Sequence, residues 1–174
     1  MGSAARKAAR KNSIGITMKW IRQSNWDEKY LILAEHISTW SKDPSTKIGA
    51  VAIGTKGQVL SQGYNGFPRG IRDTVERLNS REEKYKYIVH AEMNVVFNAS
   101  LNGISLYEST MYISGLPCCS DCAKGIIQAG VSRVVMKVKA DNYYNAKRWE
   151  DSWNLSKSMF DETGVQWDLN GITS

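Results

Sequence analysis

The sequence predicts an α/β fold, in which helices cover a central β-sheet. Segments with the 3.6-residue period of a helix alternate with short apolar runs that are bounded by turn residues. Their order is helix, strand, strand, helix, strand, helix, strand, helix, strand, and strands separated by helices favour parallel pairing in a layered arrangement. The chain has 174 residues, 42% hydrophobic and 23% charged, which is enough for one domain with a hydrophobic core.

The first predicted helix covers residues 24–41, SNWDEKYLILAEHISTWS, where Ser24 and Asp27 have the spacing of a capping box. One face of this helix is apolar, so we expect it to be buried. That face comprises Tyr30, Leu33, Ala34, Ile37 and Trp40. His36 lies off the apolar face, which favours an exposed histidine over a metal ligand.

A β-hairpin is predicted next, with strands over residues 47–53 and 59–64 and a turn at 55–58. Residues 65–87 begin with glycines and a proline and then become strongly charged, so we expect a long loop with some helix. Loops of this length in a compact domain are usually functional or disordered.

Helices and strands alternate over the rest of the chain. Helices are expected over residues 90–103, 118–130 and 145–164, and strands over residues 109–115, 133–138 and 165–169. A glycine is placed to end each of these helices. The last helix carries its large apolar side chains on one side, at Trp149, Trp153 and Phe160.

Residues 1–17 form a basic segment that we expect to be an expression tag or a disordered tail. It carries four basic residues and no acid, and so contributes four of the six net positive charges. A nucleic-acid-binding arm is the weaker alternative, because only four charges are involved. Met18 is a candidate native start, and residues 18–174 are expected to form a single domain. The sequence contains no apolar run of about 18 residues, as a membrane span would need.

The three cysteines, Cys118, Cys119 and Cys122, lie within five positions. A disulfide scaffold spreads its cysteines along the chain, whereas a clustered C-x-x-C indicates a metal or redox site in a reducing compartment. The spacing of Cys119 and Cys122 puts two sulfurs on one face of a first helical turn. We therefore expect these two to bind a metal and Cys118 to be a packed or nearby thiol.

A histidine and a carboxylate interrupt the apolar run IVHAEMNVVF at His90 and Glu92, where a helix is expected to begin. The cysteines also lie where a strand ends and a helix begins, so both loops can meet at one edge of the sheet. One imidazole and two thiolates would leave the fourth position of a tetrahedral Zn²⁺ open, as catalysis requires. Beside that position, Glu92 can take and return protons. A structural zinc half-site or a redox pair is the alternative, but a redox pair leaves both His90 and Glu92 unexplained.

These motifs resemble a known family. HAE at 90–92 and PCCSDC at 117–122 are similar to the H-x-E…P-C-x-x-C signature of zinc nucleobase deaminases, with one extra residue after the proline. Together with SKDPSTKIGAVAI at 41–53 and GYNGFPRG at 63–70, they resemble deoxycytidylate (dCMP) deaminases over about residues 26–169. The resemblance implies a three-layer α-β-α cytidine deaminase-like fold with a central five-stranded mixed sheet.

The resemblance also implies a reaction: hydrolysis of dCMP to dUMP and ammonia, which supplies dUMP for dTMP synthesis in the cytoplasm, or in the host cytoplasm if the protein is virus-encoded. His90, Cys119 and Cys122 would hold zinc, which lowers the pKa of the water that attacks C4 of cytosine. Glu92 would be the catalytic residue that carries protons to N3 and to the departing amine.

For the substrate, the resemblance implies that Asn65 reaches the sugar and that the Ala91 N–H meets the O2 edge of cytosine. It also implies an aromatic residue beside the nucleotide, either Tyr144 or Tyr143. Without the resemblance, Asn65 would be read as a turn residue and the tyrosines as ordinary surface residues.

Regulation is implied as well, with dCTP and Mg²⁺ as activator and dTTP as inhibitor. The implied effector site comprises Asn65, Gly66, Phe67, Pro68, Gly70 and Asp73, with Lys42 and Lys84 as sources of positive charge. Regulated relatives form hexamers, and the six tryptophans fit burial between subunits or within the core.

Other zinc deaminases remain as alternatives, acting on tRNA adenosine, on free cytidine or cytosine, or on a riboflavin precursor. The small net charge that remains without residues 1–17 gives no sign of a basic groove, so no nucleic-acid partner is expected. A zinc-stabilised binding module without turnover is the alternative from a different class.

Overall fold

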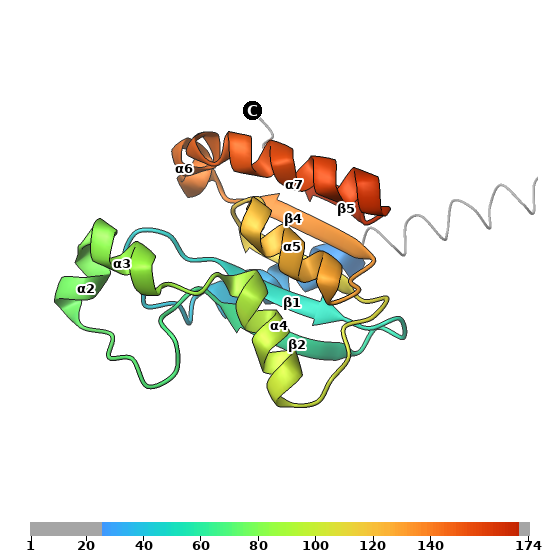
Figure 1. Ribbon diagram of the computed structural model, residues 1–174, viewed down its shortest axis with the longest axis horizontal. Helices are drawn as coiled ribbons and strands as arrows, with labels where there is room; N and C mark the ends of the chain where they lie inside the picture. The colour runs from blue at the N-terminus through green and yellow to red at the C-terminus, as the bar shows by residue number, and fades with distance from the viewer. Residues whose placement is uncertain (1–25, 171–174) are drawn as a thin grey trace, which may run out of the picture.

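The computed structural model describes residues 26–170, apart from the side chains of residues 141 and 143–145. Ser24, Met18 and the basic segment 1–17 lie outside the described residues, so their predicted roles stay predictions. The described chain forms a five-stranded sheet with the strand order β2-β1-β3-β4-β5 (Figure 1).

The elements follow the predicted order. The strands are β1 (Gly49–Ile53), β2 (Val59–Tyr64), β3 (Thr110–Gly115), β4 (Arg133–Val138) and β5 (Gln166–Asn170). Residues 26–38 are helical, and the later helices are α2 (Val75–Asn79), α3 (Arg81–Tyr87), α4 (Ala91–Leu101), α5 (Ser120–Gln128), α6 (Tyr143–Arg148) and α7 (Glu150–Thr163).

The sheet is mixed. β1 pairs antiparallel with both β2 and β3, whereas β3, β4 and β5 are mutually parallel. Gly49, at the start of β1, lies opposite Tyr64 at the end of β2 and Ser114 near the end of β3. The segments before β1 and after β2, β3 and β4 therefore gather at one edge of the sheet, and this edge carries the site described below.

Helices cover both faces of the sheet (Figure 1). The larger core, under α4, α5 and α7, includes Ala50, Met111, Ile113, Val134, Met136, Val95, Ile126 and Phe160. The smaller core, under residues 26–38, includes Leu31, Ala34, Val51, Ile53, Tyr112 and Val135. The predicted three-layer α-β-α arrangement with a five-stranded mixed sheet is confirmed.

The first helix buries most of the predicted face: Ala34 and Ile37 are buried, and Tyr30 and Leu33 pack against the smaller core. Leu31, which was not expected on the buried face, is 4% exposed, and Trp40 is 47% exposed. The helix ends at residue 38 and the chain turns, so Trp40 no longer follows the helical period. Asp27, expected in a capping box, instead accepts hydrogen bonds from Arg133 and from the Tyr112 hydroxyl. His36 is exposed, as predicted.

The expected long loop contains two short helices. The side chains of Thr74 and Ser80 cap α2 and α3 by accepting hydrogen bonds from backbone N–H groups of the following turns. α3 carries a buried lysine, Lys84, which pairs with Asp43 just before β1. The segment is thus packed against the edge of the sheet that carries the site.

The predicted helix over 145–164 is two helices. The backbone of Trp149 has ψ of 7° and so leaves the helical region between α6 and α7. Trp153 and Phe160 are buried, as expected for one side of this segment, and α7 ends at Gly164 in the left-handed conformation, with φ of 76°.

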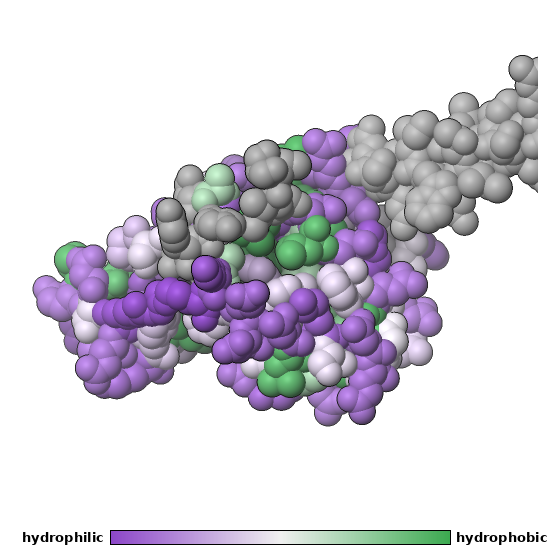
Figure 2. Space-filling view, turned by 90° about the horizontal axis from the view of Figure 1, so that it is seen from above, coloured by the Kyte–Doolittle hydropathy of each residue, from purple (hydrophilic) through white to green (hydrophobic). Residues whose placement is uncertain are grey.

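The surface on the side of α6 and α7 is mainly hydrophilic where it is described, and its hydrophobic residues form small separate groups (Figure 2). Among the described helices, none has both the length and the apolar character that crossing a membrane requires.

Candidate active site

Two helices begin next to one another at the edge of the sheet. His90 is the N-cap of α4 and Cys119 is the N-cap of α5, and neither side chain caps its own helix. An N-cap side chain usually accepts a hydrogen bond from a free backbone N–H group of the first turn. Because His90 and Cys119 do not, both side chains are available for other contacts.

Three metal-ligating atoms converge at these helix starts. The His90 Nδ1 atom lies 3.3 Å from Cys119 Sγ and 3.4 Å from Cys122 Sγ. All three ligand atoms lie within 4.8 Å of one another, and no other such cluster of His, Cys, Asp or Glu is found in the described part of the chain. Tetrahedral zinc with bonds of about 2.0–2.3 Å needs ligand atoms at about this spacing, so the donor set fits Zn²⁺ with one position left open.

Proton sharing within the cluster favours a thiolate. The pKa of Cys119 is lowered to about 4, chiefly by the hydrogen bond with Cys122 and then by His90. The hydrogen bond with Cys119 in turn raises the pKa of Cys122, and it raises the pKa of His90 to about 9. Metal binding requires deprotonated ligands, and the Cys119 sulfur and the His90 nitrogen, which share a proton, can release it when a cation binds.

Glu92 lies in the first turn of α4 and is only 4% exposed. Burial is the main cause that raises the pKa of its carboxyl group above the usual value, although the charge of His90 acts in the opposite direction. A buried carboxyl group beside a cation site can hold a proton and release it.

Cys118 is separate from the cluster. Its side chain is fully buried, and burial raises the pKa of the thiol. Its backbone carbonyl accepts a hydrogen bond of 2.8 Å from Ser156 Oγ of α7. The thiol is a packed group, in agreement with the sequence-based expectation.

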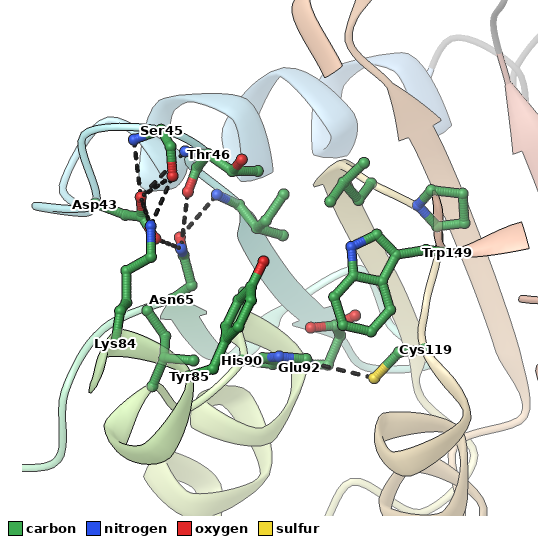
Figure 3. A pocket seen from close by; sticks show the side chains of 15 residues that line it. Asp43, Ser45, Thr46, Asn65, Lys84, Tyr85, His90, Glu92, Cys119 and Trp149 are labelled. Carbon is green, nitrogen blue, oxygen red and sulfur yellow. Dashed lines mark hydrogen bonds and ion pairs between the residues drawn. The ribbon is translucent and has the colours of Figure 1, made fainter. Parts of the chain in front are cut away.

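A pocket opens over the cluster (Figure 3). The pocket has three parts. One end carries the metal-ligating groups and Glu92, the other end carries polar groups, and an apolar wall lies between them. The lining residues are Asp43, Ser45, Thr46, Ile48, Asn65, Lys84, Tyr85, Ile88, His90, Ala91, Glu92, Leu116, Pro117, Cys119 and Trp149.

The polar end is built around a buried ion pair. Asp43 Oδ1 lies 2.9 Å from Lys84 Nζ, and both side chains are less than 10% exposed, at 5% and 8%. Burial alone would raise the pKa of Asp43, but hydrogen bonds from Lys84, Ser45 and Thr46 hold it below its usual value. Lys84 also donates to Ser45 Oγ at 2.6 Å, so its charge is used within this end of the pocket.

Asn65 stabilises the polar end of the pocket through hydrogen bonds to the backbone. Its Oδ1 accepts a 2.8 Å hydrogen bond from the Ile48 N–H, and its Nδ2 donates at 2.8 Å to the Thr46 carbonyl. These bonds fix the segment that leads into β1. The predicted contact with the substrate sugar would use the remaining lone pair of Oδ1, and it stays a prediction.

The other predicted substrate contacts are placed only in part. Ala91 lines the pocket at the first position of α4, where a helix leaves its N–H groups without intrahelical partners. Tyr143 and Tyr144 lie in α6, which follows β4 after the short 3-10 turn Ala140–Asn142, and their side chains are not described. Which tyrosine borders the substrate therefore stays open.

The residues expected at an effector site divide over three places. Gly66, Phe67 and Pro68 line a second pocket that also contains Trp40 and Arg69. Lys42 and Asp73 form an ion pair of 2.6 Å and line a third pocket together with Gly66 and Phe67. Lys84 and Asn65 line the pocket over the metal cluster instead, and Gly70 makes a left-handed turn with no atoms crowding it.

Sequence reasoning missed two aromatic residues of the pocket, Tyr85 and Trp149. Tyr85 follows Lys84 in a charged segment that was read as loop, and Trp149 was assigned to the buried side of a continuous helix. Trp149 lies at the break between α6 and α7, and its ring meets the His90 ring edge-on at 6.2 Å between centroids. No local sequence signal marks that break.

The chain matches known proteins over most of its length. A family model described as "Cytidine and deoxycytidylate deaminase zinc-binding region" matches residues 24–138. An uncharacterised deaminase of Aliivibrio fischeri is 34% identical over 143 residues, covering 82% of this chain and 92% of its own. The deoxycytidylate deaminase of Homo sapiens is 32% identical over 145 residues, covering 80% of this chain and 76% of its own.

Solved structures share the fold. The crystal structure of a dCMP deaminase from the cyanophage S-TIM5, in complex with dCMP and dUMP, superimposes with a TM-score of 0.65. That protein is 25% identical to this chain, and the match covers 82% of this chain and 95% of the phage protein.

Proposed function

The chain belongs to the cytidine and deoxycytidylate deaminase family, and from this premise we propose that it catalyses the zinc-dependent hydrolysis of dCMP to dUMP and ammonia. One observation carries the proposal: His90, Cys119 and Cys122 converge on one point beside the buried carboxyl group of Glu92, at the floor of an open pocket. A structural zinc site would need a fourth protein ligand. The described residues offer none at this cluster.

His90, Cys119 and Cys122 are the residues that would hold zinc. Zinc bound there supplies Lewis acidity, which lowers the pKa of a water molecule from about 16 towards about 7. The chain contributes the rest: two helix starts hold the donors, and the surrounding core keeps them together.

Glu92 moves the protons. Its carboxylate takes one proton from the attacking water and delivers it to N3 of cytosine. It then takes the second proton, from the hydroxyl now on C4, and donates it to the amine as the C4–N bond breaks and the C4 carbonyl forms. Burial favours the protonated form that this second task requires. The same side chain thus acts first as base and then as acid.

Ala91 and Asn65 orient the substrate. The N–H of Ala91 donates to O2 of cytosine, which fixes the base with its amine end toward the cluster. Asn65 contacts the sugar from the polar end of the pocket, and an aromatic residue of α6, Tyr144 or Tyr143, borders the nucleotide.

The substrate is tested by ammonia release. The purified zinc-loaded protein is incubated separately with dCMP, dCTP, cytidine and an RNA hairpin that contains adenosine. Deamination of dCMP at least ten times faster than of the others supports the proposal. Preference for cytidine or the hairpin would assign the chain to another branch of the family, and no deamination despite bound zinc would favour a binding module.

Regulation is part of the proposal. We expect dCTP with Mg²⁺ to activate and dTTP to inhibit, at a site that includes Gly66, Phe67 and Pro68. What supports it is the second pocket that these residues line, which adjoins the Lys42–Asp73 ion pair. Rates measured at low dCMP with each triphosphate, with and without Mg²⁺, test it, and unchanged rates would count against it.

The proposal also covers the extent of the catalytic domain, its oligomeric state and its location in the cell. Residues 18–174 form the single catalytic domain, which assembles as a homo-hexamer in the cytoplasm and supplies dUMP for dTMP synthesis. Residues 1–17 are a tail outside the catalytic unit. Light scattering coupled to size-exclusion chromatography tests the hexamer, and deletion of residues 1–17 with unchanged dCMP turnover tests the role of the tail.

A further inference from the structure

Two aromatic residues of the pocket have no role in the chemistry above. Tyr85 projects from α3, and Trp149 projects from the junction of α6 and α7. Both line the pocket that contains His90 and Glu92 (Figure 3). They come from segments about 60 residues apart in sequence, so the fold rather than local sequence brings them to one cavity.

The polar ends of these side chains are unused among the described residues. The Trp149 ring meets the His90 ring edge-on and Tyr85 stacks beneath the guanidinium of Arg81, but neither the indole N–H nor the phenol O–H bonds another described residue. Trp149 is partly buried, and a buried indole N–H usually has a hydrogen-bond partner. Tyr85 is 48% exposed, so its hydroxyl is open to a ligand that enters the pocket. Two such donors in one pocket therefore point to an acceptor on a ligand.

The other polar groups of the pocket are already engaged. Among the described lining residues Lys84 is the single lysine or arginine, and Asp43 offsets its charge. Asn65 forms its hydrogen bonds with the segment before β1, and Ser45 forms its hydrogen bonds with the Asp43–Lys84 ion pair. An anionic substrate group would find the free donors on Tyr85 and Trp149.

The two ends of a nucleotide must lie at different ends of this pocket. The amine of the base has to face the His90, Cys119 and Cys122 cluster and Glu92, which leaves the sugar and phosphate farther from it. In Figure 3 the phenol of Tyr85 reaches into the middle of the pocket, between Asn65 and Trp149, with its hydroxyl directed away from Cys119. Phosphate oxygens commonly accept hydrogen bonds from tyrosine hydroxyls and other neutral donors.

We propose that Tyr85 and Trp149 are specificity-determining residues, which bind the 5′-phosphate of the substrate by donating the phenol O–H and the indole N–H to its oxygens. Their rings pack against the nucleoside. The inference rests on the proposed function and names the part of the substrate that these residues recognise.

The test compares two substrates that differ only in the phosphate. Tyr85→Phe and Trp149→Phe each keep an aromatic ring and remove one donor, and kcat/KM is measured for dCMP and for deoxycytidine. Each variant should lower kcat/KM for dCMP about tenfold, mainly through KM, and leave the value for deoxycytidine within about twofold. Equal losses on both substrates, or no loss on either, would overturn the inference.

Matched controls exist elsewhere on the surface. Tyr107 and Trp26 are exposed and line none of the described pockets, so Tyr107→Phe and Trp26→Phe should leave both substrates unaffected. A selective effect of these controls on dCMP would show that the assay reports something other than the pocket.

A binding measurement separates failure of the inference from failure of the proposed function. If the wild-type protein does not deaminate dCMP, the function fails. In that case, isothermal titration calorimetry still measures phosphate recognition, as the difference in affinity between dUMP and deoxyuridine. Tighter binding of dUMP that is lost in the two variants supports the inference, whereas no dUMP binding, or an unchanged preference, contradicts it.

Discussion

Glu92 is the residue on which the proposed chemistry depends most directly. Glu92→Gln keeps the size of the side chain and removes its ability to exchange protons. We expect turnover of dCMP to fall by about 10²–10⁴-fold or more, because general acid–base catalysis contributes about that much and the residue acts twice. Steady-state rates, zinc content and the melting temperature are measured together, and substantial activity in the zinc-loaded variant would contradict the assigned role.

The three cysteines, which lie within five positions, can be compared directly by substitution. Cys119→Ser and Cys122→Ser each remove one of the three converging donors and should lose most bound zinc and nearly all turnover. Cys118→Ser is the matched control, because Cys118 lies outside the cluster. It should keep about one zinc per chain, although the hydroxyl in a buried site will lower stability. Zinc is quantified by mass spectrometry, and zinc loss in Cys118→Ser with retention in Cys122→Ser would reverse the assignment.

At the scale of single residues, the sequence predicted the cluster of metal-ligating residues better than it predicted their surroundings. His90, Glu92, Cys119 and Cys122 are recognisable because their residue types and short spacings are tied to metal binding. The Asp43–Lys84 pair is not, since its members are separated by 41 positions and each, taken alone, looks like an exposed charge. Burial, which no local pattern encodes, turns them into one end of the pocket.

At the scale of elements, one ion-pair network joins the first helix to the two C-terminal strands. Arg133 at the start of β4 makes two hydrogen bonds to Asp27, at 2.9 and 2.7 Å, and further bonds to Asp168 of β5. Tyr112 of β3 donates to the same Asp27 carboxylate at 2.6 Å. The network therefore ties the helical layer of residues 26–38 to three strands.

Asp27→Asn should lower the free energy of unfolding by about 1–3 kcal/mol, because it removes a charge-assisted pair that is largely shielded from water. Urea denaturation followed by circular dichroism measures the change. Glu82→Gln is the matched control: its pair with Lys86 is exposed and should be worth close to nothing. A stability for Asp27→Asn within the error of wild type would show that the network contributes little.

Element order was predictable because period-2 and period-3.6 patterns alternate cleanly along the chain. The residues at which the helices end were less predictable. The break at Trp149 and the exact ends of the two short helices within residues 65–87 were not predicted, and Trp40 leaves the buried face because the first helix ends at residue 38. Helical period alone cannot show where a helix stops.

At the scale of the whole molecule, the mixed topology explains why the site lies where it does. The antiparallel β1–β2 hairpin brings the segments before Gly49 and after Tyr64 to the same edge as the ends of β3 and β4. That edge receives the metal cluster from two helix starts and the polar end from the segment before β1. The mixed character of the sheet came from the resemblance to a family, since residues alone favoured parallel pairing, and the order of the strands was not predicted.

The most direct measurement is the rate of dCMP deamination as a function of zinc occupancy. The protein is stripped with a chelator, refilled with known amounts of Zn²⁺, and assayed for ammonia release at each step. We expect the rate to be negligible without zinc, to rise in proportion to occupancy and to level off at about one zinc per chain. Full activity in zinc-free protein, or none in protein with a filled site and intact fold, would contradict zinc-dependent deamination at His90, Cys119 and Cys122.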